Sequence, residues 1–596
     1  MVIRSRSTAG LKTRPTTHGP AGLKPAFAQS ASARSRRSLG GGGSKARPTL
    51  SVLAAGVLFS VIVSAQSRPS QIDPCAGARD LRLTNGKIVT MDRGNTTVSE
   101  LTIQDGRFTA VGPRGSQRLS PCTREINLRG RTVVPGLIDN HNHIVLLGIR
   151  PGYHTPLEGA ASIAEVQAIL KARAKSVPAG AFITSMGGWN PAQFAEKRLP
   201  TLAELDAAAP DHPVLVFQAF TGPATTNTKG KAFFTGKGVA VSETGAIGAN
   251  AGSLAALNAL RAVQTFDDKK RGTQDAMAYS ASVGVTTNAD MGAFNLPGTA
   301  DLQGSFEADT LASANQFTMY DPVVALHREG KMTTRLRVFF LTMDTRPDVP
   351  VLSERLRNDF NGFGDDMMRI SGIGEFASSW PLFGQKPPDN YQAALARIAK
   401  AGWAFQQHSL SPAENELTVS TFEAVNKETP IANLRWSLAH VGTVDDKSIA
   451  RLKAIGAAIA VHPFQFLAGG RGGPPLRTLV DSGIKLGAGS DSAQISTLNP
   501  WLVISYMVTG KALDGSLINA GQQLTRMEAL RLYTAENGWF LKEEATLGTI
   551  EPGKLADLVV LSDDYFDPKR VPDDAIRKLK SVMTVVDGKV VHNTVN

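Results

Sequence analysis

The sequence predicts an α/β protein: a (β/α)8, TIM-like barrel with a small β-sandwich built from both chain ends and a large insertion after the first barrel strand. Three observations predict this fold. Eight strand-like runs alternate with helical stretches, the order typical of a parallel sheet covered by helices. Short alternating strands occur near both ends of the chain. The interval between the first two runs is far too long for a loop.

The composition is that of a globular protein, and its basic charge is confined to one end. Of the 596 residues 42% are hydrophobic and 19% charged, which is enough for a sizeable core. The net charge is +12, but residues 1–66 hold ten basic side chains and no acidic one, which leaves 54 basic against 52 acidic residues elsewhere. The basicity therefore belongs to a leader. No basic–aromatic pattern indicates nucleic-acid binding.

Residues 1–65 are interpreted as a secretory signal peptide. A basic region precedes the apolar run 50–63, which is too short to span a bilayer comfortably. Small residues in Val63-Ser64-Ala65 then favour cleavage after Ala65. We therefore expect an exported, periplasmic or secreted protein whose mature chain does not cross the membrane. An uncleaved anchor is the alternative, and the Arg36-Arg37 pair leaves a twin-arginine export route open.

The sandwich is predicted from residues 66–134 and 546–596. The hairpin dipeptides Asn85-Gly86 and Asp105-Gly106 separate short alternating runs in the first part, and the second part has the same character. Cys75 and Cys122 both lie in the first part. An oxidising compartment favours a disulfide between them, with two unpaired cysteines as the alternative.

The barrel is predicted to span residues 135–545, with an insertion over residues 144–282. The strand-like runs are the segment ending at His143, then Val283–Asn288, Leu336–Leu341, Met368–Glu375, Trp403–His408, Leu434–His440, Ala457–His462 and Ile484–Asp491. In the insertion, Ser162 and Glu165 predict a capping box that opens a helix, and Thr201 and Glu204 predict a second one. We expect the insertion to cover the mouth of the barrel.

Residue types that bind metals occur where the predicted strands end. His141 and His143 share one face of the first strand, because alternate side chains of a strand point the same way. The C-terminal ends of barrel strands meet at one rim, so side chains from different strands converge there. Imidazoles and carboxylates are ligands that suit a divalent cation such as zinc. The candidate ligands are His141, His143, Glu375, His408, His440 and Asp491.

Four segments together resemble the amidohydrolase superfamily, and in particular its amidohydrolase family 3. They are Pro135–His143, Ser437–His440, Gly489–Asp491 and Leu547–Asp557. The resemblance implies a metal-dependent hydrolase that cleaves a carbon–nitrogen bond, other than a peptide bond, in a small molecule. It also implies two divalent ions, expected to be zinc.

The same resemblance implies how the ligands are shared. His141, His143 and Asp491 would hold one metal, and His408 and His440 the second. Relatives carry a lysine on strand four whose modified form can bridge two metals, and we align that lysine with Arg369. Because arginine cannot be modified in this way, Glu375 is expected to supply the bridging carboxylate. A glutamate paired with a nearby cation is the alternative.

The expected mechanism uses metal-activated hydroxide, with Asp491 taking a proton and passing it to the leaving nitrogen. A role for Asp491 as ligand alone is the alternative. Candidate substrate-binding residues are Tyr153, His154, Trp189 and Asn190 in the insertion and His462 after strand seven, for which simple packing is the competing interpretation.

Two other functions stay open at this point. One is a mononuclear, deaminase-like or esterase-like amidohydrolase in which Glu375 is not a ligand. The other is a barrel that binds a solute without turning it over. The sequence leaves substrate identity open, and also whether the chain forms a homo-oligomer.

Overall fold

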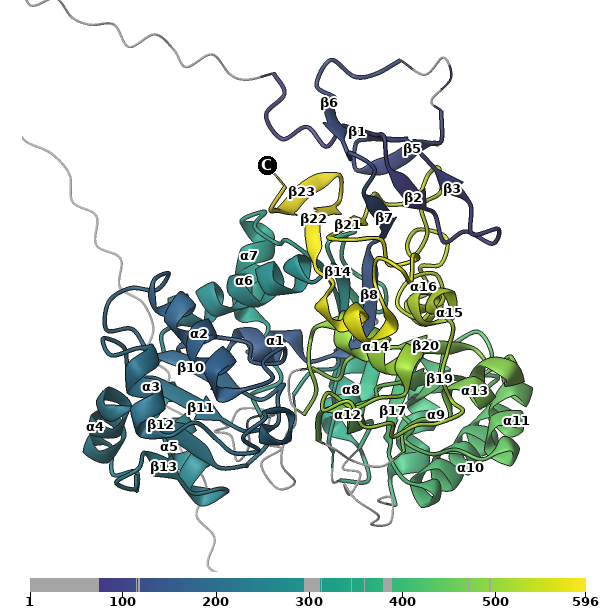
Figure 1. Cartoon of the computed structure of the whole chain (residues 1–596). Helices are drawn as coiled ribbons and strands as arrows, with labels where there is room; N and C mark the ends of the chain where they lie inside the picture. The colour runs from purple at the N-terminus through teal and green to yellow at the C-terminus, as the bar shows by residue number, and fades with distance from the viewer. Residues whose placement is uncertain are drawn as a thin grey trace, which may run out of the picture. The chain divides into compact units, whose positions relative to one another are not determined.

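A computed structural model describes residues 74–595, with gaps at 114, 116–117, 294–310, 312, 345, 359, 379–388, 469–471 and 493–494 (Figure 1). The predicted signal peptide, residues 1–65, lies outside the described residues. Within the described part, no helix combines the length and the apolar character that crossing a membrane requires.

Eight parallel strands form the central sheet in chain order, which confirms the predicted barrel. Main-chain hydrogen bonds from Asp491 N to His141 O (2.8 Å) and from His143 N to Ser492 O (2.6 Å) join its last strand to its first. The predicted runs overlap all eight strands, with ends that differ by up to three residues. The strands are β8 (Leu137–Asn142), β14 (Val285–Asp290), β15 (Arg335–Phe340), β16 (Met368–Glu375), β17 (Ala404–Ser409), β18 (Ser437–His440), β19 (Ala458–Val461) and β20 (Leu486–Ala488).

Helices follow most of these strands and cover the outside of the barrel (Figure 1). Buried aromatic side chains fill the space between the two layers; for example, the ring of Phe405 on β17 lies 5.5 Å from that of Trp436 before β18. The helices are α7 (Asp321–Arg328), α8 (Pro350–Arg357), α9 (Tyr391–Lys400), α10 (Pro412–Glu428), α11 (Asp446–Ala454), α12 (Gln465–Ala468), α13 (Leu476–Ser482), α14 (Pro500–Thr509), α15 (Arg526–Arg531) and α16 (Asn537–Phe540).

Two further sheets share one core and use both ends of the chain. The first has the order β5-β4-β1-β6, from β1 (Leu81–Thr84), β4 (Leu101–Gln104), β5 (Arg107–Val111) and β6 (Arg124–Asn127). The second has the order β23-β22-β21-β7-β2-β3, from β2 (Lys87–Val89), β3 (Thr97–Val98), β7 (Thr132–Pro135), β21 (Leu558–Leu561), β22 (Ser581–Val586) and β23 (Lys589–Asn593). Leu83, Phe108 and Val560 pack together between them. A disulfide joins Cys75 to Cys122, whose Cα atoms are 5.2 Å apart.

The insertion after β8 has a sheet of its own, with helices around it (Figure 1). Its strands, in the order β13-β12-β11-β10-β9, are β9 (Tyr153–His154), β10 (Ile183–Met186), β11 (Val214–Phe217), β12 (Ala224–Thr226) and β13 (Ala246–Ile247). Its helices are α1 (Ile144–Gly148), α2 (Ile163–Ala174), the 3₁₀ helix η1 (Pro191–Gln193), α3 (Leu202–Ala208), α4 (Thr228–Gly236), α5 (Ala251–Arg261) and α6 (Phe266–Ser282). Thr201 and Glu204 form the predicted capping box, and Ser162 accepts a hydrogen bond from Glu165 N. η1 contacts α12, which follows β19, so the insertion reaches the C-terminal end of the barrel.

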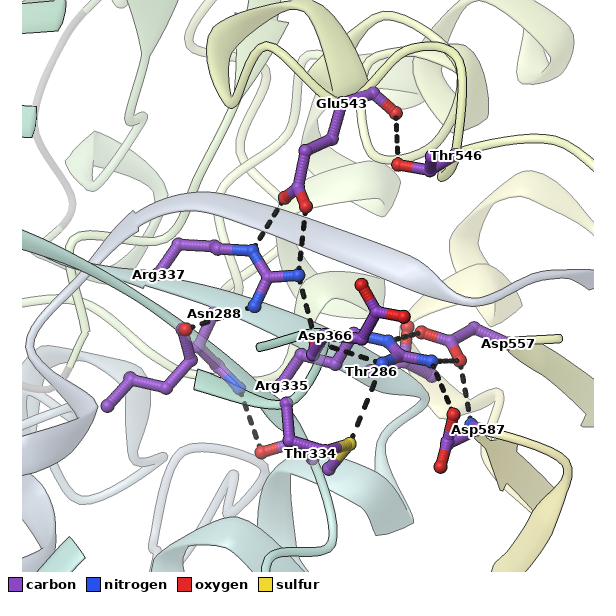
Figure 2. Close-up of polar contacts among 12 residues, drawn as sticks. Thr286, Asn288, Thr334, Arg335, Arg337, Asp366, Glu543, Thr546, Asp557 and Asp587 are labelled. Atoms are coloured by element: carbon purple, nitrogen blue, oxygen red, sulfur yellow. Dashed lines mark hydrogen bonds and ion pairs between the residues drawn. The ribbon is translucent and has the colours of Figure 1, made fainter. Parts of the chain in front are cut away.

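At the opposite end of the barrel, which we call the barrel floor, two arginines of β15 are paired with carboxylates (Figure 2). Arg335 donates to both carboxylate oxygens of Asp557 (2.8 and 2.9 Å), and Arg337 donates to both of Glu543 (2.5 and 3.0 Å). Asp557 immediately precedes β21, so the first pair joins the barrel floor to the sandwich. Both guanidinium groups are fully buried, and the two-pronged geometry supplies the hydrogen bonds that a buried charge needs.

Candidate metal centre

The ends of five barrel strands bring the six predicted ligands together. All six side chains are buried, and each comes from the C-terminal end of a strand or from the one to three residues that follow it. β8 contributes two of them, and β16, β17, β18 and the turn after β20 contribute one each. They are His141, His143, Glu375, His408, His440 and Asp491.

The first half of this cluster has the spacing of metal ligands. His143 Nε2 lies 3.4 Å from Asp491 Oδ1 and 3.6 Å from Glu375 Oε1. His141 Nε2 lies 3.8 Å from Asp491 Oδ1 and 3.9 Å from Glu375 Oε2. Four ligands placed tetrahedrally about 2.1 Å from a zinc ion are roughly 3.4 Å from one another. These nitrogen and oxygen atoms therefore lie where a single cation can be held by all of them.

The hydrogen bonds of the two histidines aim the correct nitrogen at that point. His141 Nδ1 lies 3.0 Å from Gln406 Oε1, and His143 Nδ1 lies 2.7 Å from Gly292 O. Since both oxygens accept, each Nδ1 carries a hydrogen, and in the neutral ring that binds a cation each Nε2 keeps its lone pair. Gln406 is oriented by its own Nε2, which donates to Asn140 O (3.0 Å).

One nitrogen of this half has no partner in the described part of the chain. His141 is fully buried, and its Nε2 makes no hydrogen bond. A buried polar atom without a partner is costly, and a bound cation would satisfy this one. The residues present therefore fit a divalent metal.

The second half of the cluster is drawn closer together. Glu375 Oε2 lies 2.6 Å from His408 Nδ1 and 2.8 Å from His440 Nε2, which are hydrogen-bond distances. His408 Nε2 is buried and also has no partner among the described residues. Glu375 belongs to both halves, because its other oxygen faces His143.

Burial and the neighbouring charges set the protonation of the cluster. Burial, with a further contribution from the charge of His440, lowers the pKa of His141 to about 3, so that imidazole is neutral at pH 7. Burial acts to raise the pKa of Glu375, but the imidazoles of His408 and His143 outweigh it and hold that pKa well below its usual range. The pKa of Asp491 is lowered as well, because His440, His143 and His141 together outweigh burial. A neutral imidazole and two carboxylates are the states in which these groups bind a cation.

The predicted substrate-binding residues lie in different surroundings. Trp189 is buried in the core of the insertion, with its ring 5.7 Å from that of Phe194. Asn190 caps η1, and the Tyr153 ring lies 3.7 Å from the Arg271 guanidinium. None of these three side chains, nor His154, hydrogen-bonds to a candidate ligand in the described part of the chain.

Two of the predicted substrate-binding residues adjoin other features of the site. His154 lines a cavity of about 240 Å³ at the junction of β9, α1 and α6. His462 is buried directly behind the cluster, where its Nδ1 accepts a hydrogen bond from His440 N (2.9 Å). The substrate-binding roles of all five residues stay predictions.

Position 369 does not lie at the metal centre, so it is not the place of a metal-bridging residue. Arg369 is the second residue of β16, and its guanidinium donates to Glu543 at the barrel floor (2.8 Å). Six residues of strand, roughly 20 Å at about 3.3 Å per residue, separate it from Glu375 at the other end. A lysine at position 369 would lie at the wrong end of the barrel to bridge metals.

Sequence reasoning missed the amides that orient the ligands. Gln406 lies two residues before His408 and so shares its face of β17, which is a signal that the period of two could have given. Asn140 lies beside His141 but points to a different set of partners. Asn537, on α16, carries no sequence signal that connects it to the cluster.

Comparisons with known proteins point to one family. A family model described as "Amidohydrolase family" matches residues 124–592. The N-substituted formamide deformylase of Arthrobacter pascens is 23% identical over 557 residues, which cover 86% of this chain and 98% of the deformylase. The protein LONG AFTER FAR-RED 3 of Arabidopsis thaliana is 24% identical over 83% of this chain and 89% of that protein.

Solved structures share the fold. An uncharacterized metal-dependent hydrolase from Pyrococcus furiosus has a TM-score of 0.53 and 21% identity, covering 82% of this chain and 100% of that chain. An atrazine chlorohydrolase from Arthrobacter aurescens, complexed with zinc, has a TM-score of 0.51 and 15% identity, covering 86% of this chain and 95% of that chain.

Proposed function

The chain belongs to the amidohydrolase family and is a metal-dependent hydrolase of carbon–nitrogen bonds, and from this premise we propose that it cleaves an amide-type bond of a small molecule with the cluster described above. The observation that carries the proposal is the buried, unpartnered Nε2 of His141, whose lone pair faces two carboxylates. In the proposal His141, His143 and Asp491 hold one cation, His408 and His440 hold a second, and Glu375 contacts both.

The ligand set supports zinc as the metal, because neutral imidazoles and carboxylates suit it. A bound divalent cation lowers the pKa of water and polarises a carbonyl group, which is the chemistry that amide hydrolysis requires.

Asp491 is proposed as the group that moves the proton. Its Oδ1 faces the two imidazoles of β8, and its Oδ2 lies 3.6 Å from His440 Nδ1. Its pKa is lowered, because the neighbouring histidines together outweigh burial, so it is a carboxylate at neutral pH and can accept a proton from water. The same carboxyl group can then deliver that proton to the departing nitrogen, for which a protonated amine is a far better leaving group than an amide anion.

A small N-substituted amide is the proposed substrate class. The support is the likeness to N-substituted formamide deformylase, which extends over 98% of that enzyme. We propose that Tyr153, His154, Trp189 and Asn190 belong to the part of the insertion that shapes the approach to the metals. η1, which Asn190 caps, supports this, because it contacts α12 beside the C-terminal end of the barrel.

Export is part of the same proposal. The support is the basic and apolar leader together with the Cys75–Cys122 disulfide, a bond that persists in an oxidising compartment. Fractionation of cells that express the full chain tests it, and a full-length protein retained in the cytoplasm contradicts it.

One observation favours a second candidate, a hydrolase with a single metal. His141, His143, Asp491 and Glu375 have the spacing of ligands, whereas Glu375, His408 and His440 are already at hydrogen-bond distances from one another. In this candidate the second group of residues moves protons instead of holding a cation.

Metal analysis of the purified protein separates the two candidates. We expect two equivalents of zinc per chain and hydrolysis of small N-substituted amides. Replacing Glu375→Gln should remove at least one equivalent, while Glu543→Gln, a buried carboxylate at the barrel floor, should remove none. One equivalent in the unaltered protein favours the single-metal hydrolase. Unchanged metal content in Glu375→Gln refutes the shared role of Glu375.

A further inference from the structure

A chain of hydrogen bonds crosses the inside of the barrel and ends at His440. It runs from Asn537 on α16 through Asn140 on β8 to His462 after β19. We propose that this chain fixes which nitrogen of His440 carries its hydrogen, and that His462 is a positioning residue for His440 and does not bind substrate. The consequence for metal binding rests on the function proposed above, whereas the assignment of hydrogens does not.

The chain begins at main-chain groups whose roles as donor or acceptor are fixed. Asn537 Nδ2 donates to Ile138 O (2.6 Å) and to Ala488 O (2.7 Å). Asn537 Oδ1 accepts from Ala488 N (3.2 Å). These three contacts determine the orientation of the Asn537 amide, because the reverse orientation would set its oxygen against two carbonyl oxygens.

The same orientation passes to the next two residues. Asn140 Nδ2 donates to Asn537 Oδ1 (2.8 Å), which leaves Asn140 Oδ1 to face His462 Nε2 (3.3 Å). An amide oxygen can only accept, so His462 Nε2 carries the hydrogen. In the neutral ring His462 Nδ1 is then an acceptor.

His462 Nδ1 receives two donors from the same residue. It accepts from His440 N (2.9 Å) and lies 3.1 Å from His440 Nδ1. Two bare nitrogens would repel each other at that distance, so His440 Nδ1 carries its hydrogen and donates it. In a neutral His440 ring Nε2 then keeps its lone pair, and this nitrogen lies 2.8 Å from Glu375 Oε2. The chain therefore turns the binding nitrogen of His440 toward the proposed cation.

The surroundings leave room for the chain and for little else. A Cβ on Gly487 would lie 2.3 Å from Asn537 Oδ1, and a Cβ on Gly489 would lie 2.7 Å from Asn140 Oδ1. Strand β20 and the residue after it thus need glycine where the two amides pass. His462 is 1% exposed, with its ring 4.2 Å from that of His141. A ring enclosed in this way, with both nitrogens engaged, has no free surface for a substrate.

The hydrogen-bond chain also stabilises the backbone conformation of His440. Its φ of +72° lies in the left-handed region, which is unfavourable for a residue with a side chain. The hydrogen bond from His440 N to His462 Nδ1 stabilises that conformation. The partner of a metal-binding histidine typically changes metal affinity about 10- to 100-fold when it is removed.

Nitrogen-15 NMR of the histidine rings tests the assignment in the full-length protein loaded with Zn²⁺ and again after chelation. Two-bond correlations from the ring hydrogens show which nitrogen is protonated. We expect His462 to be protonated at Nε2 and not at Nδ1 both with Zn²⁺ and after chelation, and His440 to be protonated at Nδ1 alone when Zn²⁺ is bound. A His462 ring that is protonated at Nδ1, or at both nitrogens, overturns the proposal. If the protein binds no Zn²⁺ at all, that result counts against the proposed function. The protonation of His462 in the metal-free protein still tests the present proposal.

Two variants of equal polarity separate positioning from simple packing. His462→Asn keeps an oxygen acceptor near the position of Nδ1, whereas His462→Gln places its amide toward the position of Nε2. We expect His462→Asn to bind the second Zn²⁺ within about threefold of the unaltered protein, and His462→Gln to bind it about 10- to 100-fold more weakly. Thermal unfolding of both metal-free variants controls for folding. Equal affinities in the two variants, whether retained or lost, contradict the positioning role.

Discussion

Two buried polar clusters lie at opposite ends of the same barrel, and they differ in how completely their charges are paired. At the barrel floor, Arg335 and Arg337 each meet a carboxylate with two hydrogen bonds, and both also donate to Asp366 O (2.9 and 3.0 Å). At the C-terminal end, His141 Nε2 and His408 Nε2 are buried with no partner in the described residues. The Arg335 and Arg337 pairs are complete in themselves, whereas the metal cluster needs something added.

This difference predicts which cluster contributes mainly to stability and which mainly to function. Burial does not distinguish them, because both clusters are buried. Both clusters hide charged groups, and both draw residues from distant parts of the chain. A fully paired cluster is destabilised when one partner is removed, because the other charge is left buried. A cluster with unpaired atoms tolerates substitution better in the fold and loses its chemistry instead. The following predictions test that contrast.

The largest effect is expected from Asp491→Asn. Removing the proton acceptor should lower kcat/KM on an N-substituted amide by roughly 10²- to 10⁴-fold. The free energy of unfolding of the metal-free protein should stay within about 1 kcal/mol of the unaltered chain, since Glu375 still faces His143 and His440 when residue 491 is neutral. Steady-state kinetics and urea unfolding measure the two quantities. If the variant lost enough stability to account for its lost activity, the predicted difference between the metal cluster and the barrel floor would be contradicted.

Arg335→Met should show the reverse pattern. It leaves Asp557 buried without its partner and should lower the free energy of unfolding by about 3–5 kcal/mol. The kcat of the molecules that remain folded should be unchanged, because Arg335 lies at the far end of β15 from the ligands. Urea unfolding, with kinetics normalised to the folded fraction, is the measurement. The double variant Arg335→Met/Asp557→Asn should recover part of the loss, and no recovery would mean that the charge is not the cause.

Removing the metal by chelation should lower the free energy of unfolding, and the size of this decrease should depend on the metal cluster and not on the barrel floor. A metal present at about 100 times its dissociation constant contributes roughly 2.7 kcal/mol to folding, and EDTA should remove that amount. The decrement should be the same in Glu543→Gln, which is altered at the floor, and smaller in Glu375→Gln. Unfolding curves with and without EDTA provide the comparison. Equal decrements in the two variants would contradict the assignment of Glu375.

The smallest effect is expected from a two-pronged pair at the surface. Arg198 donates to both oxygens of Glu204 (2.8 and 2.7 Å), and this hydrogen bonding outweighs the opposite effect of partial burial and lowers the pKa of Glu204 to about 2. Because the folded pKa is depressed, the pair stabilises the fold above about pH 4.5 and loses that contribution as the pH falls toward 2. Exposure limits the contribution to less than about 1 kcal/mol. Glu204→Gln should therefore cost under about 1 kcal/mol at pH 7 and nothing near pH 2, as measured by urea unfolding at both pH values. A cost like that of the buried pairs would show that geometry, not burial, decides.

Much of the metal cluster could be predicted because its residues obey short local rules. His141 and His143 share a face through the period of two in a strand, and Asp491 follows an apolar run. The barrel then forces such strand ends to one rim. Arg369 shows where this reasoning fails. Its assignment to the metal site rested on an alignment with relatives, whereas its side chain lies at the barrel floor.

The barrel floor and the amide chain could not be predicted because their partners are set by tertiary structure. Arg335 and Arg337 alternate in an apolar strand, which indicates two charges turned the same way. Nothing near them in the sequence indicates Asp557 or Glu543, more than 200 residues later. Uncharged Asn140 and Asn537 give still less warning, because an asparagine is equally common in a turn.

The position of β21 in its sheet determines when during synthesis that sheet can be completed. β21 pairs with β7 on one side and with β22 on the other, so the sheet that β2, β3 and β7 begin is completed only by residues 558–593. Asp557, the partner of buried Arg335, arrives with that same segment. A ribosome must therefore release nearly the whole polypeptide before β7 has its second neighbour, and loss of the last 40 or so residues would remove three of the six strands of that sheet.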